Sequence, residues 1–301
     1  MIVRAIRARI ILPALSRIPE SPSRGPTAGP GAIPLISMLW LYDLPLWALC
    51  TLILALCVAY ALGTVLLVRR LRWQLTGEDN AIAAALHAFV GVLYAVALGL
   101  LVVSAQDANS DVERAVAAEA NATGDLYRVM AGLEPGNRDR MQAELSRYVD
   151  QVVRVEWPAT QQARTSRETW DAMNHISRGI YTFRPATPQE ERVYPQLTHE
   201  IEEVLDARRD RLFLGERGVG AVTWTIILLG GMITVGFTAF FEMRNRRAQL
   251  LLTSLMAAMF GLMIFLIAAM DHPLWGTLSV DAGPFEQLQA NIARQQADVH
   301  R

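Results

Sequence analysis

The stretch LLLTSLMAAMFGLMIFLIAAMDHPLWG, residues 250–276, contains a long uncharged run that stops at an acid, a histidine and a proline. A helix needs about 20 residues to cross the hydrocarbon core of a bilayer, and a charge near its centre costs roughly 2.5–3.5 kcal/mol. The run from Leu250 to Met270 is long enough and carries no charge. It therefore predicts a membrane-spanning helix that stops near Asp271, because Pro273 cannot continue the helix.

Three further runs have the same character and carry no charged side chain: Leu46–Val68, Ala81–Ser104 and Val219–Phe241. Hydrophobic residues make up 52% of the 301-residue chain, a high share for a soluble domain, and the excess is concentrated in these runs. The sequence therefore predicts an all-α integral membrane protein. It has four transmembrane helices and a helical extramembrane insert between the second and the third.

The spans divide the chain into five segments. Residues 1–37 are rich in Pro, Gly and Ser, a composition typical of disorder. We expect a disordered or mis-called N-terminal extension there, with Met38 as the true start. The other segments are expected to be the first transmembrane helix pair, the helical extramembrane domain, the second transmembrane pair, and an interfacial segment with a C-terminal helix: 38–104, 105–218, 219–270 and 271–301.

Apolar residues recur with helical spacing through the insert, which predicts amphipathic helices. One stripe comprises Met141, Leu145, Tyr148, Val152 and Val155. A second comprises Val193, Leu197, Ile201, Val204, Leu205 and Leu212. Thr187 before Pro188, with Glu190 three residues after Thr187, is typical of a helix start. The second helix is therefore expected to begin there.

Other helices of the extramembrane part follow from the same spacing. We expect the second span to continue outward as far as Met130, and a shorter helix to run from near Trp170 to near Phe183. The mixed charges between Glu200 and Arg211 are predicted to form a solvated helix face. This run includes Arg208, Arg209 and Arg211.

Arginine distribution predicts the orientation. The two short loops contain six arginines: Arg69, Arg70, Arg72, Arg244, Arg246 and Arg247. Ahead of the first span only Arg24 is at all close, and residues 271–290 contain none. Because arginines in short loops stay in the cytoplasm, we expect both short loops inside a bacterial inner membrane. The insert and both termini are then extracytoplasmic.

Small residues recur at every fourth position in three spans: Ala55, Ala59 and Gly63; Gly91, Ala95 and Gly99; Gly230, Thr234 and Thr238. Such faces let helix backbones approach closely in lipid. The pattern indicates either ordinary packing within one bundle or a face that lines a pore or a subunit interface. The expected partners are the lipid bilayer and further copies of the chain, as a homo-oligomer.

No pattern in the sequence indicates an enzyme. There is no Gly-rich phosphate loop and no His-Glu-x-x-His, and His175 and His199 have no second ligand at metal spacing. The net charge of −1 gives no indication of nucleic-acid binding. We therefore expect no catalytic residue, no cofactor and no metal site.

Asp271, the acid at the end of the fourth span, is expected to have a partner that offsets its negative charge. A carboxylate at a helix C-terminus faces the negative end of the helix dipole, which costs about 0.3–1 kcal/mol. We predict that Asp271 pairs with Arg217, which precedes the third span on the same side. The backbone N–H groups of Gly276 and Thr277 are the alternative.

The same stretch also has a functional interpretation. Asp271 and His272 would then form an ion-facing pair near Asp43, on the outer face of the membrane. Pro273 restricts the backbone of His272 in either case. Both interpretations stay open on the sequence alone.

Several stretches of the chain occur in the order found in a known family: Leu41–Trp47, Gly63, Glu119–Tyr127, Tyr148 with Val152 and Val153, Glu156–Pro158, and Asp271–Val280. Through them, roughly Met38 to Leu288 resembles the bestrophin-like domain-of-unknown-function family of bacterial membrane proteins. The resemblance implies two helical pairs flanking a helical insert, and kinship to bestrophin anion channels, which are pentamers. It implies no catalytic residues.

Bestrophins place the insert and both termini in the cytoplasm, opposite to the orientation that the arginines predict here. Two functions remain open. The first is an oligomeric ion channel, with anions as the expected ions. The alternative is a non-conducting membrane scaffold or envelope-sensing protein whose insert binds a partner of unknown identity.

Overall fold

The four apolar runs form helices long enough to cross a membrane, as the sequence predicts. In the computed structural model, which describes residues 45–164, 166–275 and 279–299, they are α3 (Leu46–Leu71), α4 (Gly77–Met130), α9 (Ala221–Phe237) and α10 (Arg246–Met270). A short 3₁₀ turn, η3 (Thr238–Phe240), extends α9. The described residues contain no strand, and a single bridge between Leu75 and Phe241 joins the two short loops.

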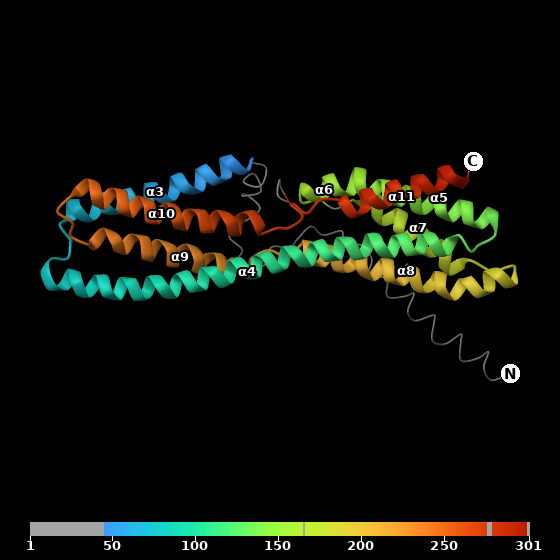
Figure 1. The fold of residues 1–301 in the computed structure, drawn as a ribbon, viewed down its shortest axis with the longest axis horizontal. Helices are drawn as coiled ribbons and strands as arrows, with labels where there is room; N and C mark the ends of the chain where they lie inside the picture. Colours follow the sequence, from blue (N-terminus) through green and yellow to red (C-terminus); the bar gives the residue numbers. More distant parts are fainter. Residues whose placement is uncertain (1–44, 165, 276–278, 300–301) are drawn as a thin grey trace, which may run out of the picture. The chain divides into compact units, whose positions relative to one another are not determined.

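The second span continues far beyond the membrane as one helix. α4 has 54 residues without a break, and its outer half packs along α8 (Pro188–Gly215). Figure 1 shows α4 running from the bundle of spans into the bundle of insert helices. The continuation to Met130 agrees with the prediction, since α4 ends at that residue.

The insert and the C-terminal segment build the second bundle. Its elements, besides α4 and α8, are α5 (Pro135–Gln151), η2 (Val152–Glu156), α6 (Trp157–Gln161), α7 (Arg167–Thr182) and α11 (Gly283–Val299). The predicted stripe residues Leu197, Ile201 and Val204 are fully buried in its core. Thr187 caps α8, because its hydroxyl accepts from the Glu190 N–H at 3.3 Å.

One stripe of the insert departs from the expected helical phase. The prediction placed Val155 on the core side, but Val155 is 38% exposed and Glu156 is buried instead. The reason is η2, a π-helical turn over Val152–Glu156. A π turn accommodates one extra residue, so every later side chain is rotated relative to the α-helical pattern. Trp157, the next residue, is buried as well.

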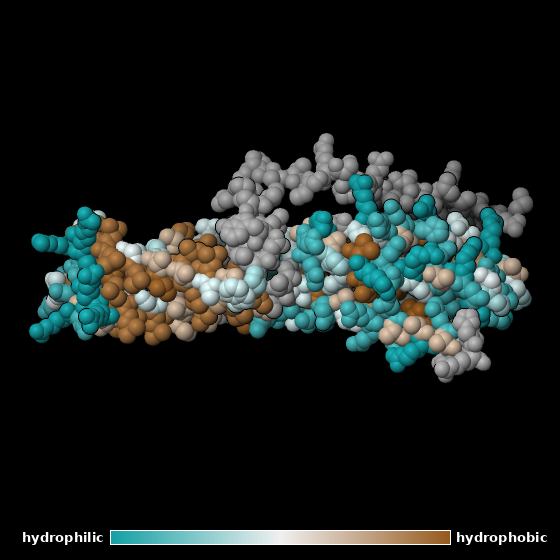
Figure 2. Space-filling model, turned by 90° about the horizontal axis from the view of Figure 1, so that it is seen from above, coloured by the Kyte–Doolittle hydropathy of each residue, from teal (hydrophilic) through white to brown (hydrophobic). Residues whose placement is uncertain are grey.

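The spans border polar surface on both sides. Figure 2 shows a continuous apolar band over the spans, with a narrow polar cap where α3 turns into α4 and α9 into α10. Polar residues dominate the surface on the other side of the band. An exposed apolar band of this kind is the surface that a bilayer covers.

Candidate functional site

Asp271 links the C-terminal end of the fourth span to the N-terminal end of the third. The backbone N–H of Val219 donates to Oδ1 of Asp271 at 2.5 Å, and the indole N–H of Trp224 donates to Oδ2 at 3.2 Å. The aspartate is only 5% exposed. The N–H groups of Val219, just before α9, and of Trp224, in its first turn, therefore satisfy the buried carboxylate of Asp271, which follows α10.

Arg217 does not form the predicted ion pair with Asp271. Its guanidinium carbon lies 4.2 Å from the ring centroid of Phe213, a cation–π contact. Gly218 explains how the chain passes so close to the acid. A Cβ at Gly218 would lie 3.1 Å from Oδ1 of Asp271 and 2.6 Å from Cε1 of His272. The alternative donors Gly276 and Thr277 lie outside the described residues.

His272 and Pro273 fold back beside the acid. Nδ1 of His272 lies 3.3 Å from Oδ2 of Asp271, and its ring stacks on Trp275 with centroids 4.0 Å apart. The buried Pro273 accepts at its carbonyl from the Val280 N–H at 2.7 Å. The structure therefore brings Asp271, His272 and Pro273 together. The other candidates, Asp43 and Gly276, lie outside the described residues.

A second polar centre, which we call the buried ion cluster, lies in the core of the insert. It consists of Glu119 on α4, Tyr148 on α5, Glu156 in η2, and Arg208 and Arg211 on α8, each at most 2% exposed. Arg208 donates to Glu156 at 2.7 Å and to the Tyr148 hydroxyl at 2.8 Å. Arg211 donates to Glu156 at 2.5 Å and also to Glu119. Tyr148 donates to Glu119 at 2.7 Å.

The charges of the buried ion cluster balance, and each ionised group depends on the others. Burial opposes ionisation of Glu156, but Arg211 and Arg208 outweigh it, so the pKa of Glu156 lies below its ordinary value. Burial and the nearby Glu119 carboxylate raise the pKa of Tyr148 well above its usual range. The tyrosine hydroxyl therefore stays protonated and can donate. Removing one member would leave a buried charge uncompensated.

The buried ion cluster corrects one prediction. Arg208 and Arg211 do not belong to a solvated face, whereas Arg209 between them does, with 66% of its side chain exposed. The signal was present in the sequence. Arg208 and Arg211 continue the spacing of the buried residues Ile201 and Val204, so they fall on the core side of α8.

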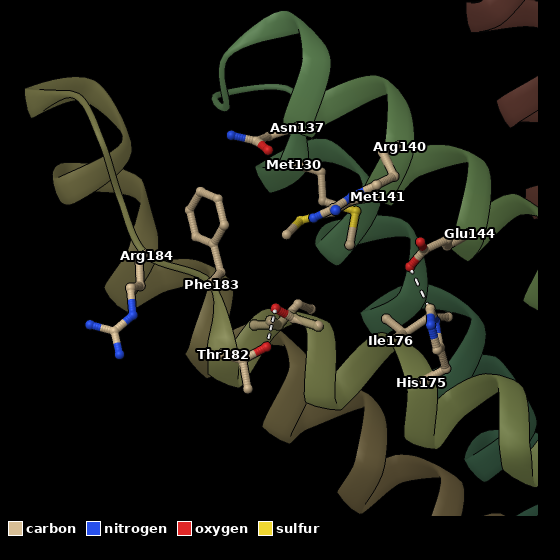
Figure 3. Close-up of a pocket in the computed structure, with 12 residues that line it drawn as sticks. Met130, Asn137, Arg140, Met141, Glu144, His175, Ile176, Thr182, Phe183 and Arg184 are labelled. Carbon is tan, nitrogen blue, oxygen red and sulfur yellow. Dashed lines mark hydrogen bonds and ion pairs between the residues drawn. The ribbon is translucent and has the colours of Figure 1, made fainter.

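A cavity of about 460 Å³ opens between α5 and α7, near the end of α4. Met130, Met141 and Ile180 form its apolar floor, and all three are buried. Figure 3 shows Glu144 and His175 facing each other at its side, with Oε2 and Nδ1 3.5 Å apart. Among the described residues no cluster of His, Cys, Asp and Glu is arranged to hold a metal ion.

The three small-residue faces of the spans differ in what covers them. On α9, the ring of Tyr94 lies directly against Gly230, and Thr234 is 1% exposed. On α3 and α4, by contrast, a Cβ added at Gly63, Gly91 or Gly99 would meet no atom within 4 Å. The face on α9 therefore serves packing within the chain, and no described residue covers the glycines of the other two.

A row of large apolar side chains on the span part of α4 is also uncovered. Its members are spaced 4-3-4-3 along the helix and are 53–68% exposed: Ile82, Leu86, Phe89, Leu93, Val96, Leu100 and Val103. We call this row the heptad face of α4. A seven-residue repeat keeps one side of a helix turned toward a neighbouring helix.

Comparison with known proteins places these features in a family. The model of the bestrophin-like domain matches residues 54–285. Crystal structures of a bacterial bestrophin homologue from Klebsiella pneumoniae share the fold. One variant gives a TM-score of 0.63 at 13% identity, covering 82% of this chain and 98% of its own. Another gives 0.62 at 14% identity, covering 81% and 97%. No curated protein sequence matches the chain.

Proposed function

Because the chain belongs to the bestrophin-like family, we propose that it forms an oligomeric ion channel in which α4 lines the conduction path. The resemblance to bestrophin anion channels makes anions the proposed ions. The span part of α4, from Ala81 to Ser104, carries no carboxylate, so its wall holds no fixed negative charge that would repel an anion. The proposal assigns no catalytic residue.

The heptad face of α4 is the observation that carries this proposal. Its side chains point away from the other spans of the same chain and are more than half exposed. Arranged around a common axis, such faces would form an apolar constriction, which gates conduction by excluding water. Phe89 and Leu93 lie near the middle of the face.

The uncovered small-residue faces support the proposed homo-oligomer. Gly63 on α3 and Gly91 and Gly99 on α4 leave open space beside the backbone. A second copy of the chain can bring a helix close to each of these faces, as small residues allow in lipid. Each copy offers one such face on α3 and one on α4, so neighbouring copies can repeat the same contact around a ring.

The channel is tested by recording current from the purified protein in planar bilayers. We expect an anion-selective current, which Phe89→Ala or Leu93→Ser alters in conductance or gating. The matched control is Leu251→Ser on α10, 69% exposed outside the heptad face, and it should conduct like the wild type. Folded, oligomeric protein that stays silent contradicts the proposal.

The proposed orientation keeps both short loops in the cytoplasm of a bacterium and the insert and termini outside. The support is the six arginines of the short loops. Reporter fusions within the insert and after Asp271 test it. An insert reporter that is active only in the cytoplasm would overturn it and would match the bestrophin orientation.

The cavity near α5 and α7 favours the alternative, a non-conducting scaffold or envelope-sensing protein whose insert binds a partner. It combines an apolar floor with charged side chains at its edge, such as Arg140 and Glu144. Affinity capture through the insert would then recover a partner that Met141→Arg, at the floor, abolishes. Failure to recover a reproducible partner, together with a measured current, excludes this alternative.

A further inference from the structure

The two short loops of the membrane bundle form one surface. The N–H of Leu75 donates to the carbonyl of Phe240 at 2.8 Å. Arg69 joins them a second time, because its Nη2 donates to the Met243 carbonyl at 3.0 Å and its Nε to Oε1 of the buried Gln249 at 2.8 Å. Arg69 is therefore used inside the protein, to hold the loops together.

The other five arginines of these loops point into solvent: Arg70, Arg72, Arg244, Arg246 and Arg247. We call them the arginine surface. Within the described part of the chain, none of their guanidinium groups has a hydrogen bond or an ion pair. The acids of the same loops are Glu78 and Asp79, at the positive N-terminus of α4, and Glu242. The six arginines of the two loops outnumber these three acids, so the surface keeps an excess of positive charge.

The arginine surface lies at the edge of the apolar band. Figure 2 shows the polar cap directly against the band at this end. Trp73, in the same loop as Arg72, is 63% exposed, and Leu71 is 45% exposed. Tryptophan prefers the interface between hydrocarbon and headgroups. If Trp73 occupies that depth, the neighbouring guanidinium groups lie at the depth of the lipid phosphates.

The opposite border of the band has no comparable excess of positive charge. Asp107, Asp111 and Glu216 lie there, and they outnumber the neighbouring Arg114 and Arg217. Arg114 also forms an ion pair with Asp111.

We propose that the arginine surface binds the headgroup phosphates of anionic phospholipids, with Trp73 anchored beside them. Guanidinium groups bind phosphate oxygens through paired hydrogen bonds, and each basic residue near an anionic membrane strengthens binding about fivefold. Both loops contribute arginines to one binding surface, because the hydrogen bonds of Arg69 hold the loops together. This inference does not depend on whether the protein conducts ions or on which leaflet the loops face.

Native mass spectrometry of the full-length protein tests the proposal. The protein is extracted from vesicles with equal amounts of phosphatidylglycerol and phosphatidylcholine, and the retained lipids are counted. We expect the wild type to retain phosphatidylglycerol preferentially. Substitution of Arg70, Arg72 and Arg246 by Gln should reduce that preference at least about tenfold, and substitution of the same three by Lys should restore most of it.

The matched control replaces three exposed arginines of the insert helices by Gln: Arg114, Arg128 and Arg209. It removes the same charge far from the short loops and should keep the preference. Helicity and melting temperature show that each variant is folded. The proposal is overturned if the wild type retains both lipids equally, if the Gln variant of the short loops keeps the preference, or if the control loses it to the same degree.

Discussion

Nη2 of Arg208 donates to Oε2 of Glu156 at 2.7 Å, between side chains that are 1% and 3% exposed. The two residues come from α8 and η2, and the π turn of η2 is what carries Glu156 into the core. Two charges buried away from water must each be fully paired, because moving each ion out of water costs several kcal/mol. The Arg208–Glu156 pair therefore holds the π turn of η2 at a fixed position along α8, the longest helix of the insert.

Replacement of Arg208 by Ala is expected to lower the free energy of unfolding by about 3–5 kcal/mol, since the two buried carboxylates Glu119 and Glu156 would keep only Arg211 as a positive partner. The control is Arg209→Ala, one residue further along α8, whose exposed ion pair with Asp206 contributes at most about 1 kcal/mol. Melting temperatures of the two variants in the same detergent give the comparison. Equal melting temperatures would show that the buried ion cluster carries no stability.

The protein is expected to lose stability in acid. The pKa of Glu156 lies below its ordinary value because its two arginines outweigh burial, and the N–H groups of Ala186 and Asn137 lower the pKa of Glu190. A carboxyl with a lowered folded pKa stabilises the fold above the unfolded pKa, which is about 4.3 for Glu. This stability is lost as the pH falls through the folded pKa.

The melting temperature should accordingly change little between about pH 7 and about pH 5, and fall below about pH 4. In Glu190→Gln the fall should be smaller, because one of the two titrating groups is gone while an acceptor oxygen remains. A melting temperature that rises on acidification, or a variant that falls as steeply as the wild type, contradicts the assignment.

Asp271→Ala should destabilise the junction of the third and fourth spans by about 1–3 kcal/mol, because the Val219 N–H and the Trp224 indole lose a buried acceptor. Asp271→Asn keeps one acceptor oxygen and should lie in between. Arg217→Gln is the control, since Arg217 stacks on Phe213 instead. If Arg217→Gln matched Asp271→Ala, a direct ion pair would have to be reconsidered.

Two glycines of the spans should respond differently to the same change. Gly230→Val would force the ring of Tyr94 away, and overpacking of this kind costs about 1–3 kcal/mol. A Cβ at Gly99 would meet no described atom within 4 Å, so in Gly99→Val the protomer should fold normally while the oligomer weakens. Melting temperature and light scattering after size-exclusion chromatography separate the two effects. An unchanged oligomer in Gly99→Val would remove the uncovered face of α4 from the proposed interface.

The membrane part was predictable because hydrocarbon permits few alternatives: an uncharged run of about 20 residues must be a helix. Leu46 and Met270 bound spans in both the prediction and the structure. The insert was less predictable. Val155 follows an α-helical period, and only the π turn moves it outward. No propensity of the residues at Val152–Glu156 announces that turn.

For a different reason, the sequence does not reveal the buried ion cluster. The charge of Arg208 and Arg211 predicts a solvated face, although their spacing places them among Ile201 and Val204. Whether an arginine is buried depends on a partner brought by another segment, here Glu119 and Glu156, and pairing over such distances is not encoded locally. For Asp271 the sequence indicates that the acid needs a partner but not which one, because the uncharged N–H donors of Val219 and Trp224 do not appear in a count of charges.

Because α4 is unbroken, the directions of its side chains in the membrane bundle and in the insert bundle are fixed relative to each other. Tyr94 contacts α9 in the membrane bundle, and Glu119 enters the buried ion cluster, with no joint between them. Each added residue turns an α-helix by about 100°. One residue inserted between these positions would aim either the tyrosine or the glutamate at the wrong neighbour, whereas an insertion of seven nearly restores the angle. Over its length of about 80 Å, the helix therefore fixes the direction of Glu119 in the insert relative to that of Tyr94 in the membrane bundle.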